Sequence, residues 1–269
     1  PYYDLNISLK NGNILKISDT FRDSPSFGGY IDSNFRLYGI PDDIRATGLF
    51  EARGFSLEGY FVDKVTGKAI YEKGKFSFSD VKMKRKESLM KINGIISLDK
   101  KFLFFAEGES INLPDMISNN LNLPSAVIQN PSFKAVLLKN IKIKGEGSFE
   151  KPYIEMVADI SGGPLKTGAI GAGRLVLKLE EKELNLNATI LDQKLRIRGN
   201  VRLTEHLPWS ARIDIYPSRY DFLIESFLKD VPDDLLISLS GTIIAEGDND
   251  HISASANIDR THIFLYGIG

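Results

Sequence analysis

Apolar and polar residues alternate along most of this chain. In segment 174–180, apolar side chains stand at Leu175, Leu177 and Leu179, and mostly polar residues fill the gaps. Successive side chains of a β-strand point to opposite faces, so this spacing predicts strands with one apolar and one polar face. The same pattern recurs at 184–190, 195–203, 209–215, 235–243 and 252–258. The sequence therefore predicts an all-β fold of roughly twenty strands.

The N-terminal half shows the same alternation with less regular spacing. Asn11-Gly12 between the apolar runs 5–9 and 15–17 predicts a hairpin turn. Residues 18–33, which contain Pro25 and a Gly-Gly pair, are expected to form a polar loop. Further strands are expected at 35–37, 55–61, 76–78, 81–83, 92–98, 102–106, 141–143 and 154–160.

Two segments interrupt the alternation. Residues 115–121 are compatible with about two turns of helix. Ser218 and Asp221 have the spacing of a capping box, and 222–228 carries apolar residues at helical spacing. The second helix is interpreted either as a lid over an apolar trough or as a cap on one stretch of core.

Glycines and apolar runs recur at a nearly fixed spacing. Gly39 precedes Gly145 by 106 residues, and Gly94 precedes Gly199 by 105. Such self-similarity is typical of repeat proteins. We therefore expect one repeat-built β domain over residues 1–269, with a partial repeat at 1–34, full repeats at 35–140 and 141–236, and a partial repeat at 237–269.

The apolar face of such a sheet must be covered. It could pack on a second sheet as a dry sandwich core, close into a barrel, or line a trough in a sheet that grows along one axis. The repeat favours the trough. We expect an elongated, curled and mainly antiparallel β-sheet with a hydrophobic groove, plus short amphipathic helices. At about 4.8 Å per strand it would extend on the order of 90 Å.

A groove of this kind suits acyl chains, since each methylene moved into water costs about 0.8 kcal/mol. The residues expected to line it share the apolar phase of their strands: Leu37, Ile92, Ile96, Phe104, Ile143, Met156, Leu175, Leu177, Leu186, Ile197, Val201, Ile213 and Leu239. No lining role is assigned to Leu57.

Composition narrows the chemistry. The 34 Lys and Arg against 35 Asp and Glu give a net charge of -1, which predicts no nucleic-acid partner. Absence of cysteine excludes thiolate chemistry, and the three histidines have no metal-ligand spacing. No nucleophile elbow or zinc-protease motif is present. We therefore expect that the protein is not an enzyme and that it has no catalytic residues, no metal and no cofactor. The longest apolar stretch, 102–106, is too short to span a bilayer.

Several segments resemble the TamB and AsmA-like family. The resemblance rests on the Gly145–Pro152 spacing followed by Tyr-Ile-Glu-Met, on 191–199 ending in Gly199, and on 207–211 with its Pro-Trp pair. It implies a curled, taco-like β-sheet around a hydrophobic groove, and a role in moving phospholipid to the outer membrane as a bridge-like lipid transfer protein. It also implies a periplasmic location and an outer-membrane barrel partner similar to TamA.

The family is anchored in the inner membrane by an N-terminal helix that this sequence lacks. The chain starts at Pro1 and shows no signal peptide, so we interpret it as an internal piece of a longer protein. On this interpretation, segments that flank this piece in the longer protein would contact the membrane.

Three functions remain open at this point. A lipid conduit predicts phospholipid in the groove. An assembly factor for outer-membrane proteins predicts pairing of a strand edge with a TamA-like barrel and little lipid. A structural β-solenoid predicts an interior filled by its own side chains. The resemblance favours the conduit.

Overall fold

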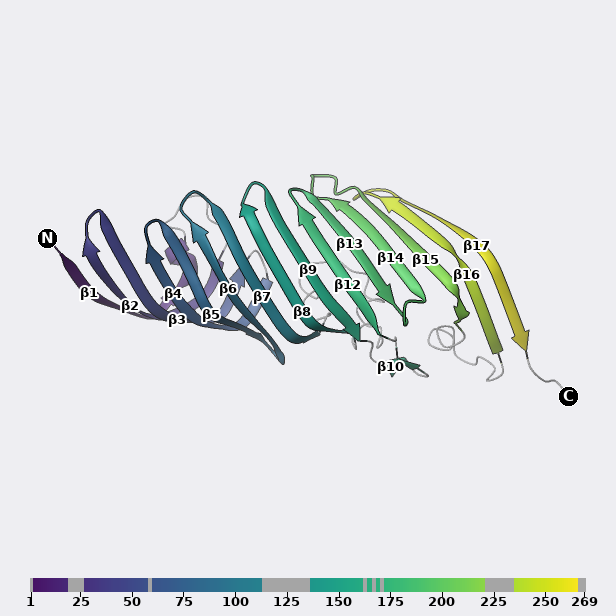
Figure 1. Ribbon diagram of the computed structural model, residues 1–269, viewed down its shortest axis with the longest axis horizontal. Helices are drawn as coiled ribbons and strands as arrows, with labels where there is room; N and C mark the ends of the chain where they lie inside the picture. The colour runs from purple at the N-terminus through teal and green to yellow at the C-terminus, as the bar shows by residue number, and fades with distance from the viewer. Residues whose placement is uncertain are drawn as a thin grey trace. The chain divides into compact units, whose positions relative to one another are not determined.

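The computed structural model describes residues 2–18, 27–57, 60–112, 136–161, 164–165, 168–169, 172–220 and 235–265. Nearly all of these residues belong to antiparallel β-sheet. Fifteen strands follow one hydrogen-bonded order, β1 to β9 and then β12 to β17, so that order in the sheet is order in the chain (Figure 1). The prediction of an all-β, mainly antiparallel sheet is confirmed.

The chain divides into two compact units. The N-terminal unit takes the described residues up to Ile111 together with Asn140–Pro152, and the C-terminal unit takes those from Tyr153 onward with a few residues before Asn140.

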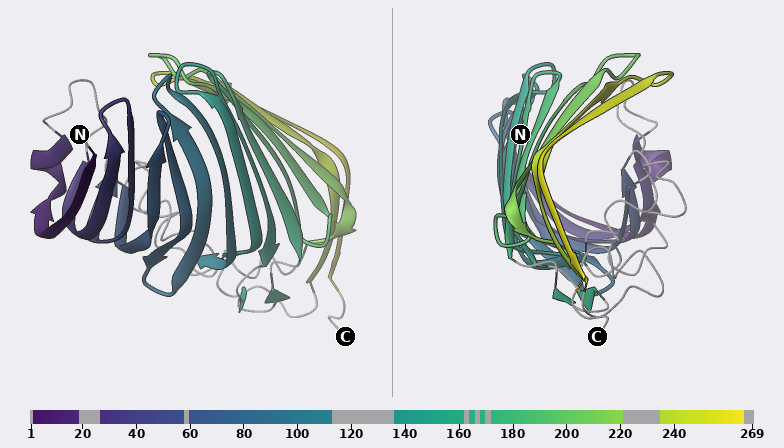
Figure 2. Two further views of the ribbon diagram at one scale, coloured as in Figure 1. Left: turned by 60° about the vertical axis from the view of Figure 1, so that its left-hand side comes forward. Right: turned by 90° about the vertical axis from the view of Figure 1, so that its right-hand side faces the viewer.

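The strands of the N-terminal unit are long. They are β1 (Tyr3–Asn13), β2 (Phe27–Ile40), β3 (Asp43–Leu57), β4 (Tyr60–Glu72), β5 (Lys75–Arg85), β6 (Ser88–Ser97), β7 (Lys101–Asn112) and most of β8 (Leu137–Ser148). A short helix, α1 (Ile14–Ser18), follows β1. Figure 2 shows that β4 to β7 bend along their length.

The main-sheet strands of the C-terminal unit range from 8 residues in β12 to 14 in β17. They are β9 (Pro152–Ser161), β12 (Gly173–Glu180), β13 (Glu183–Ile190), β14 (Leu195–Arg202), β15 (Trp209–Arg219), β16 (Leu235–Gly247) and β17 (Ile252–Leu265). Two two-residue strands, β10 (Pro164–Leu165) and β11 (Gly168–Ala169), form a separate pair.

Tight turns set the strand pairing. Lys73 and Gly74 join β4 to β5 with φ values of 49° and 72°. Positive φ at both central residues is the signature of the type I′ turn, whose twist matches that of the flanking strands. Elsewhere, positive φ inside a strand marks a bulge. Asp80 has φ 53°, and the β5–β6 register shifts between Phe78 and Val81.

The prediction of a hairpin turn at Asn11-Gly12 is wrong. β1 runs through both residues, and the register with β2 shifts between Leu9 and Gly12. Asn11 has φ 51°, and its N–H donates to Asp32 Oδ1 at 2.6 Å. The left-handed residue therefore makes a bulge within a continuing strand. Residues 15–17 lie in α1 rather than in a strand, and the loop expected at 18–33 gives way to β2 at Phe27.

The two expected helices fall largely outside the described residues. This holds for 115–121 and for 222–228. Arg219, expected in the first turn of the second helix, is instead the last residue of β15. No helix therefore begins at Ser218 or Arg219, where the capping-box pattern predicted its start.

Small residues form much of the core of each unit. In the N-terminal unit, Ala52, Val65 and Val81 are buried on three successive strands, and Phe50 and Phe78 pack against them. In the C-terminal unit, Ala158, Leu175 and Ala188 are buried on β9, β12 and β13. These cores lie on the face that carries the apolar phase of the strands.

Candidate functional site

The register of the C-terminal unit brings the apolar phase of its strands onto one face. Leu177 pairs with Met156 on one side and with Leu186 on the other. Ile197 pairs with Ile213, and directly paired residues project from the same face of a sheet. The predicted lining residues on this face are Met156, Leu175, Leu177, Leu186, Ile197, Val201, Ile213 and Leu239. We call the surface defined by these residues the C-terminal apolar face.

The N-terminal unit has an equivalent surface. The direct pairs on it include Leu37 with Ala46, Ile92 with Ala106, Ile96 with Phe102, and Phe104 with Gly94. Ile143 lies two residues from Gly145, and Gly145 contacts the Phe104 ring, so Ile143 shares this face. The N-terminal apolar face therefore holds Leu37, Ile92, Ile96, Phe104 and Ile143.

A hollow of about 550 Å³ opens on the N-terminal apolar face. We call it the N-terminal hollow. Its lining comes from five strands and is apolar apart from one hydroxyl, that of Tyr71. The lining residues are Ile7, Ile31, Phe35, Leu37, Ala46, Phe50, Ala69, Tyr71, Phe76 and Phe78. The volume lies within the range of about 300–1,000 Å³ that is usual for small-molecule sites.

Aromatic rings supply most of the wall. The Tyr71 and Phe76 rings pack with centroids 4.7 Å apart. Alanines on β3 and β4, Ala46 and Ala69, leave the space that larger side chains would fill. Ile7 lines the hollow while half of its surface is exposed, so the hollow is open to solvent at β1. The arrangement can take up an extended apolar group that enters from solvent.

Sequence reasoning found one residue of this lining, Leu37. It missed Ala46, Phe50, Ala69 and Tyr71 because no strand was expected at 43–54 or 62–72. A signal was present: in 44–52, Ile, Ala, Gly, Phe and Ala occupy alternate positions. Glycine and alanine are weakly apolar, so the alternation was hard to recognise.

The C-terminal unit contains a hollow of different character. Leu186 borders it together with Gly199 and Ala211, and its volume is about 530 Å³. Most of its other lining side chains are polar, among them Lys178, Asn185 and Arg198. This hollow is therefore a poor place for an acyl chain.

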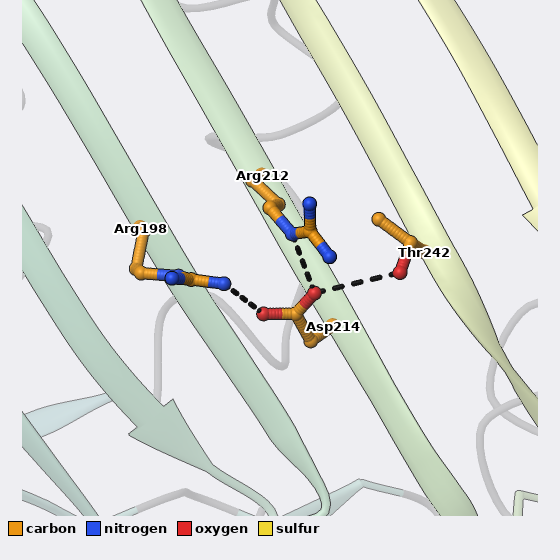
Figure 3. A network of polar contacts seen from close by, with 4 residues as sticks. All are labelled: Arg198, Arg212, Asp214 and Thr242. Carbon is orange, nitrogen blue, oxygen red and sulfur yellow. Dashed lines mark hydrogen bonds and ion pairs between the residues drawn. The ribbon is translucent and has the colours of Figure 1, made fainter.

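The polar face of the C-terminal unit holds a charged network on β14, β15 and β16 (Figure 3). Asp214 accepts hydrogen bonds from Arg198 Nη2 at 2.6 Å and from Arg212 Nε at 2.7 Å. Thr242 Oγ1 donates to the same carboxylate at 3.4 Å. The Arg212 guanidinium, and then that of Arg198, hold the pKa of Asp214 below its ordinary value of 3.8. The network links three strands of this face.

Among the described residues, no group of three or more His, Asp or Glu side chains could hold a metal ion. Within the same part of the chain, no helix has the length and apolar character needed to cross a membrane. In comparisons with known proteins, no family model, no curated protein and no solved structure matches this chain.

Proposed function

We propose that this chain is a lipid-carrying segment, which shelters phospholipid acyl chains along the apolar faces of its β-sheet. The observation that carries the proposal is the N-terminal hollow. It is an open space of about 550 Å³ that is lined by ten residues, nine of which have wholly apolar side chains. Water in such a space finds few hydrogen-bond partners, so replacing it by methylene groups is favourable.

The energetics support a lipid tail as the occupant. Each methylene removed from water contributes about 0.8 kcal/mol, so ten sheltered methylenes contribute about 8 kcal/mol. The lining offers Tyr71 as its single polar side chain, which is too little to recognise a polar ligand. In our proposal acyl tails lie against the apolar faces in a taco-like groove, while headgroups stay in water.

The proposal includes a cellular role. The resemblance to the TamB and AsmA-like family supports a periplasmic segment that carries phospholipid between the inner and outer membranes, without enzymatic activity. On this proposal the cargo is phospholipid, and a TamA-like barrel is a candidate partner of the longer protein.

The direct test is mass spectrometry of an organic extract from the purified chain. We expect phospholipid to be present in the extract. We also expect the chain to bind a fluorescent fatty acid in a saturable manner.

A substitution within the hollow makes the test specific. Ala46→Arg places a long charged side chain among Leu37 and Tyr71, its partners on the neighbouring strands. Desolvating this charge beside an acyl chain is costly, so we expect probe affinity to fall at least about tenfold. Leu49→Arg is the matched control, because Leu49 lies on the opposite face of β3 and is 65% exposed. Circular dichroism checks that both variants fold.

Two results would contradict the proposal. One is an extract free of lipid combined with equal probe binding by wild type, Ala46→Arg and Leu49→Arg. The other is unfolding of Ala46→Arg while Leu49→Arg folds, since the apolar face would then be an ordinary packed core.

A further inference from the structure

A second hollow on the polar face of the C-terminal unit has a composition suited to an anion. Its volume is about 450 Å³, and its lining includes Arg174, Asn187, Thr189, Gln193, Arg196 and Tyr216. We call it the arginine hollow. It contains two guanidinium groups, two amides and two hydroxyls, and no carboxylate lines it.

The register explains how the two arginines come together. Arg174 on β12 pairs with Thr189 on β13, and Thr189 pairs with Arg196 on β14. The three residues form one row across the sheet, with the threonine in the middle. At about 4.8 Å between strands, the two arginine Cα atoms lie about 10 Å apart. Long side chains from both ends can therefore meet over the Thr189 hydroxyl.

Within the described residues, no ion pair compensates the charge of Arg174 or Arg196. Asp159 on β9 stands opposite Arg174 on β12 but makes no ion pair with it. By contrast, Lys178 on β12 pairs with Glu155 on β9 at 3.2 Å.

The carboxylate opposite Arg196 is already engaged elsewhere. Asp214 pairs with Arg196 in the β14–β15 register, yet its oxygens accept from Arg198, Arg212 and Thr242. Figure 3 shows both of these arginines pointing toward that carboxylate. Arg196 is thus left with its donors available beside the hollow.

We propose that the arginine hollow binds a phosphate group. A guanidinium donates through a planar fork that matches the oxygens of an oxyanion, and charge-assisted hydrogen bonds of this kind are the strong ones. Two forks, the Thr189 hydroxyl and the Gln193 amide supply donors from several directions. A tetrahedral phosphate has enough acceptor oxygens for all of them, whereas a carboxylate has two. The site does not depend on the lipid-carrying function, because within the C-terminal unit it lies on the face opposite the C-terminal apolar face.

The first arm of the test uses inorganic phosphate. It is titrated into the isotopically labelled chain at constant ionic strength, with chloride as the balancing anion, and arginine Nε–H resonances are followed by NMR. We expect saturable shifts for Arg174 and Arg196. Arg196→Gln should weaken phosphate binding at least about tenfold, the effect of losing one charge-assisted contact. Arg196→Lys keeps the charge without the fork and should also weaken it.

Arg202→Gln is the matched control. Arg202 lies on the same strand and face and pairs with Glu183 at 3.1 Å, outside the hollow. An exposed pair of this kind contributes little, so phosphate affinity should change less than about twofold.

The second arm identifies the source of the phosphate. Cosedimentation is measured with vesicles of phosphatidylcholine and phosphatidylglycerol. Vesicle binding that inorganic phosphate competes away and Arg196→Gln abolishes assigns the site to a lipid headgroup. Phosphate binding without such vesicle binding assigns it to a soluble phosphate compound. Absence of saturable binding in both arms overturns the proposal, as does an equal loss in Arg202→Gln and Arg196→Gln.

Discussion

At the scale of the residue, the side chain of Tyr220 stabilises the C-terminal unit at a position outside the alternating strand pattern. Tyr220 follows β15 and is buried, with its hydroxyl 2.9 Å from the Lys194 carbonyl oxygen and 2.7 Å from that of Tyr216. Burial also raises the pKa of this phenol above its ordinary value. The ring and hydroxyl together hold the end of β15 against the turn that precedes β14.

Removing this hydroxyl should destabilise the fold. We expect Tyr220→Phe to lower the free energy of unfolding by about 1–2 kcal/mol, because a buried hydrogen bond is lost. Tyr216→Phe is the control, since the Tyr216 side chain is 46% exposed. Urea denaturation of the two variants measures the difference. Equal effects would show that the hydroxyl of Tyr220 has no special role.

The charge on Asp214 gives a pH dependence with a definite sign. Its pKa is lower in the folded protein than its ordinary value of 3.8, through Arg212 first and then Arg198. The stabilisation is therefore complete above the unfolded pKa and is lost as pH falls through the folded pKa. Asp214→Asn should lower the free energy of unfolding at neutral pH by about 1 kcal/mol.

Denaturation curves at several pH values test this. The difference between wild type and Asp214→Asn should shrink as pH falls below about 4. A difference that stays constant with pH would mean that the carboxylate charge does not carry the effect.

At the scale of the element, close packing between strands sets a limit on size. A Cβ added at Gly145 on β8 would collide with the ring of Phe104 on β7. Gly145→Ala should therefore lower the free energy of unfolding by about 1–3 kcal/mol, as overpacking does. Combining it with Phe104→Leu should recover part of that loss. A double-mutant cycle, measured by thermal or urea denaturation, tests whether the two substitutions interact. Additive changes in the free energy of unfolding would contradict the packing argument.

The strands differ in how far the sequence could predict them. β12 and β13 carry leucines at alternate positions, so their apolar phase was evident, and their pairing follows from a short turn at Glu181-Lys182. β3 and β4 place glycine and alanine at many inward positions, so they were missed. The bulge at Asn11 was mistaken for a turn, because a left-handed Asn before Gly serves both.

The residues of the candidate site also differ in how far the sequence could predict them. Leu37 was predicted because it stands in a run of large apolar residues, whereas Ala46 and Ala69 could not be recognised as the residues that open the hollow. A hollow is a place where side chains are small, and a pattern of hydrophobicity does not report volume. The row of Arg174, Thr189 and Arg196 was equally out of reach, because it depends on the register of three strands.

At the scale of the whole molecule, each strand is stabilised mainly by its sheet neighbours, so stability should vary along the chain as in repeat proteins. The amides of β4 and β5 adjoin the buried Val65 and Val81, whereas residues 252–263 of β17 are all exposed. We expect amide hydrogen exchange in β4 and β5 to be at least about tenfold slower than in β17. Mass spectrometry of exchanged peptides measures it, and uniform exchange would indicate a single cooperative block.

The order of the strands also bears on how the polypeptide is made. Among the described strands of the main sheet, each pairs with the next one along the chain, with the short β10 and β11 between β9 and β12. Each new strand released from a ribosome or an export channel therefore finds its partner already in place. Where the connection is short, as between β12 and β13, closing it costs little entropy, and low contact order favours rapid folding even in an all-β protein. A half-synthesised chain can already display a finished stretch of sheet.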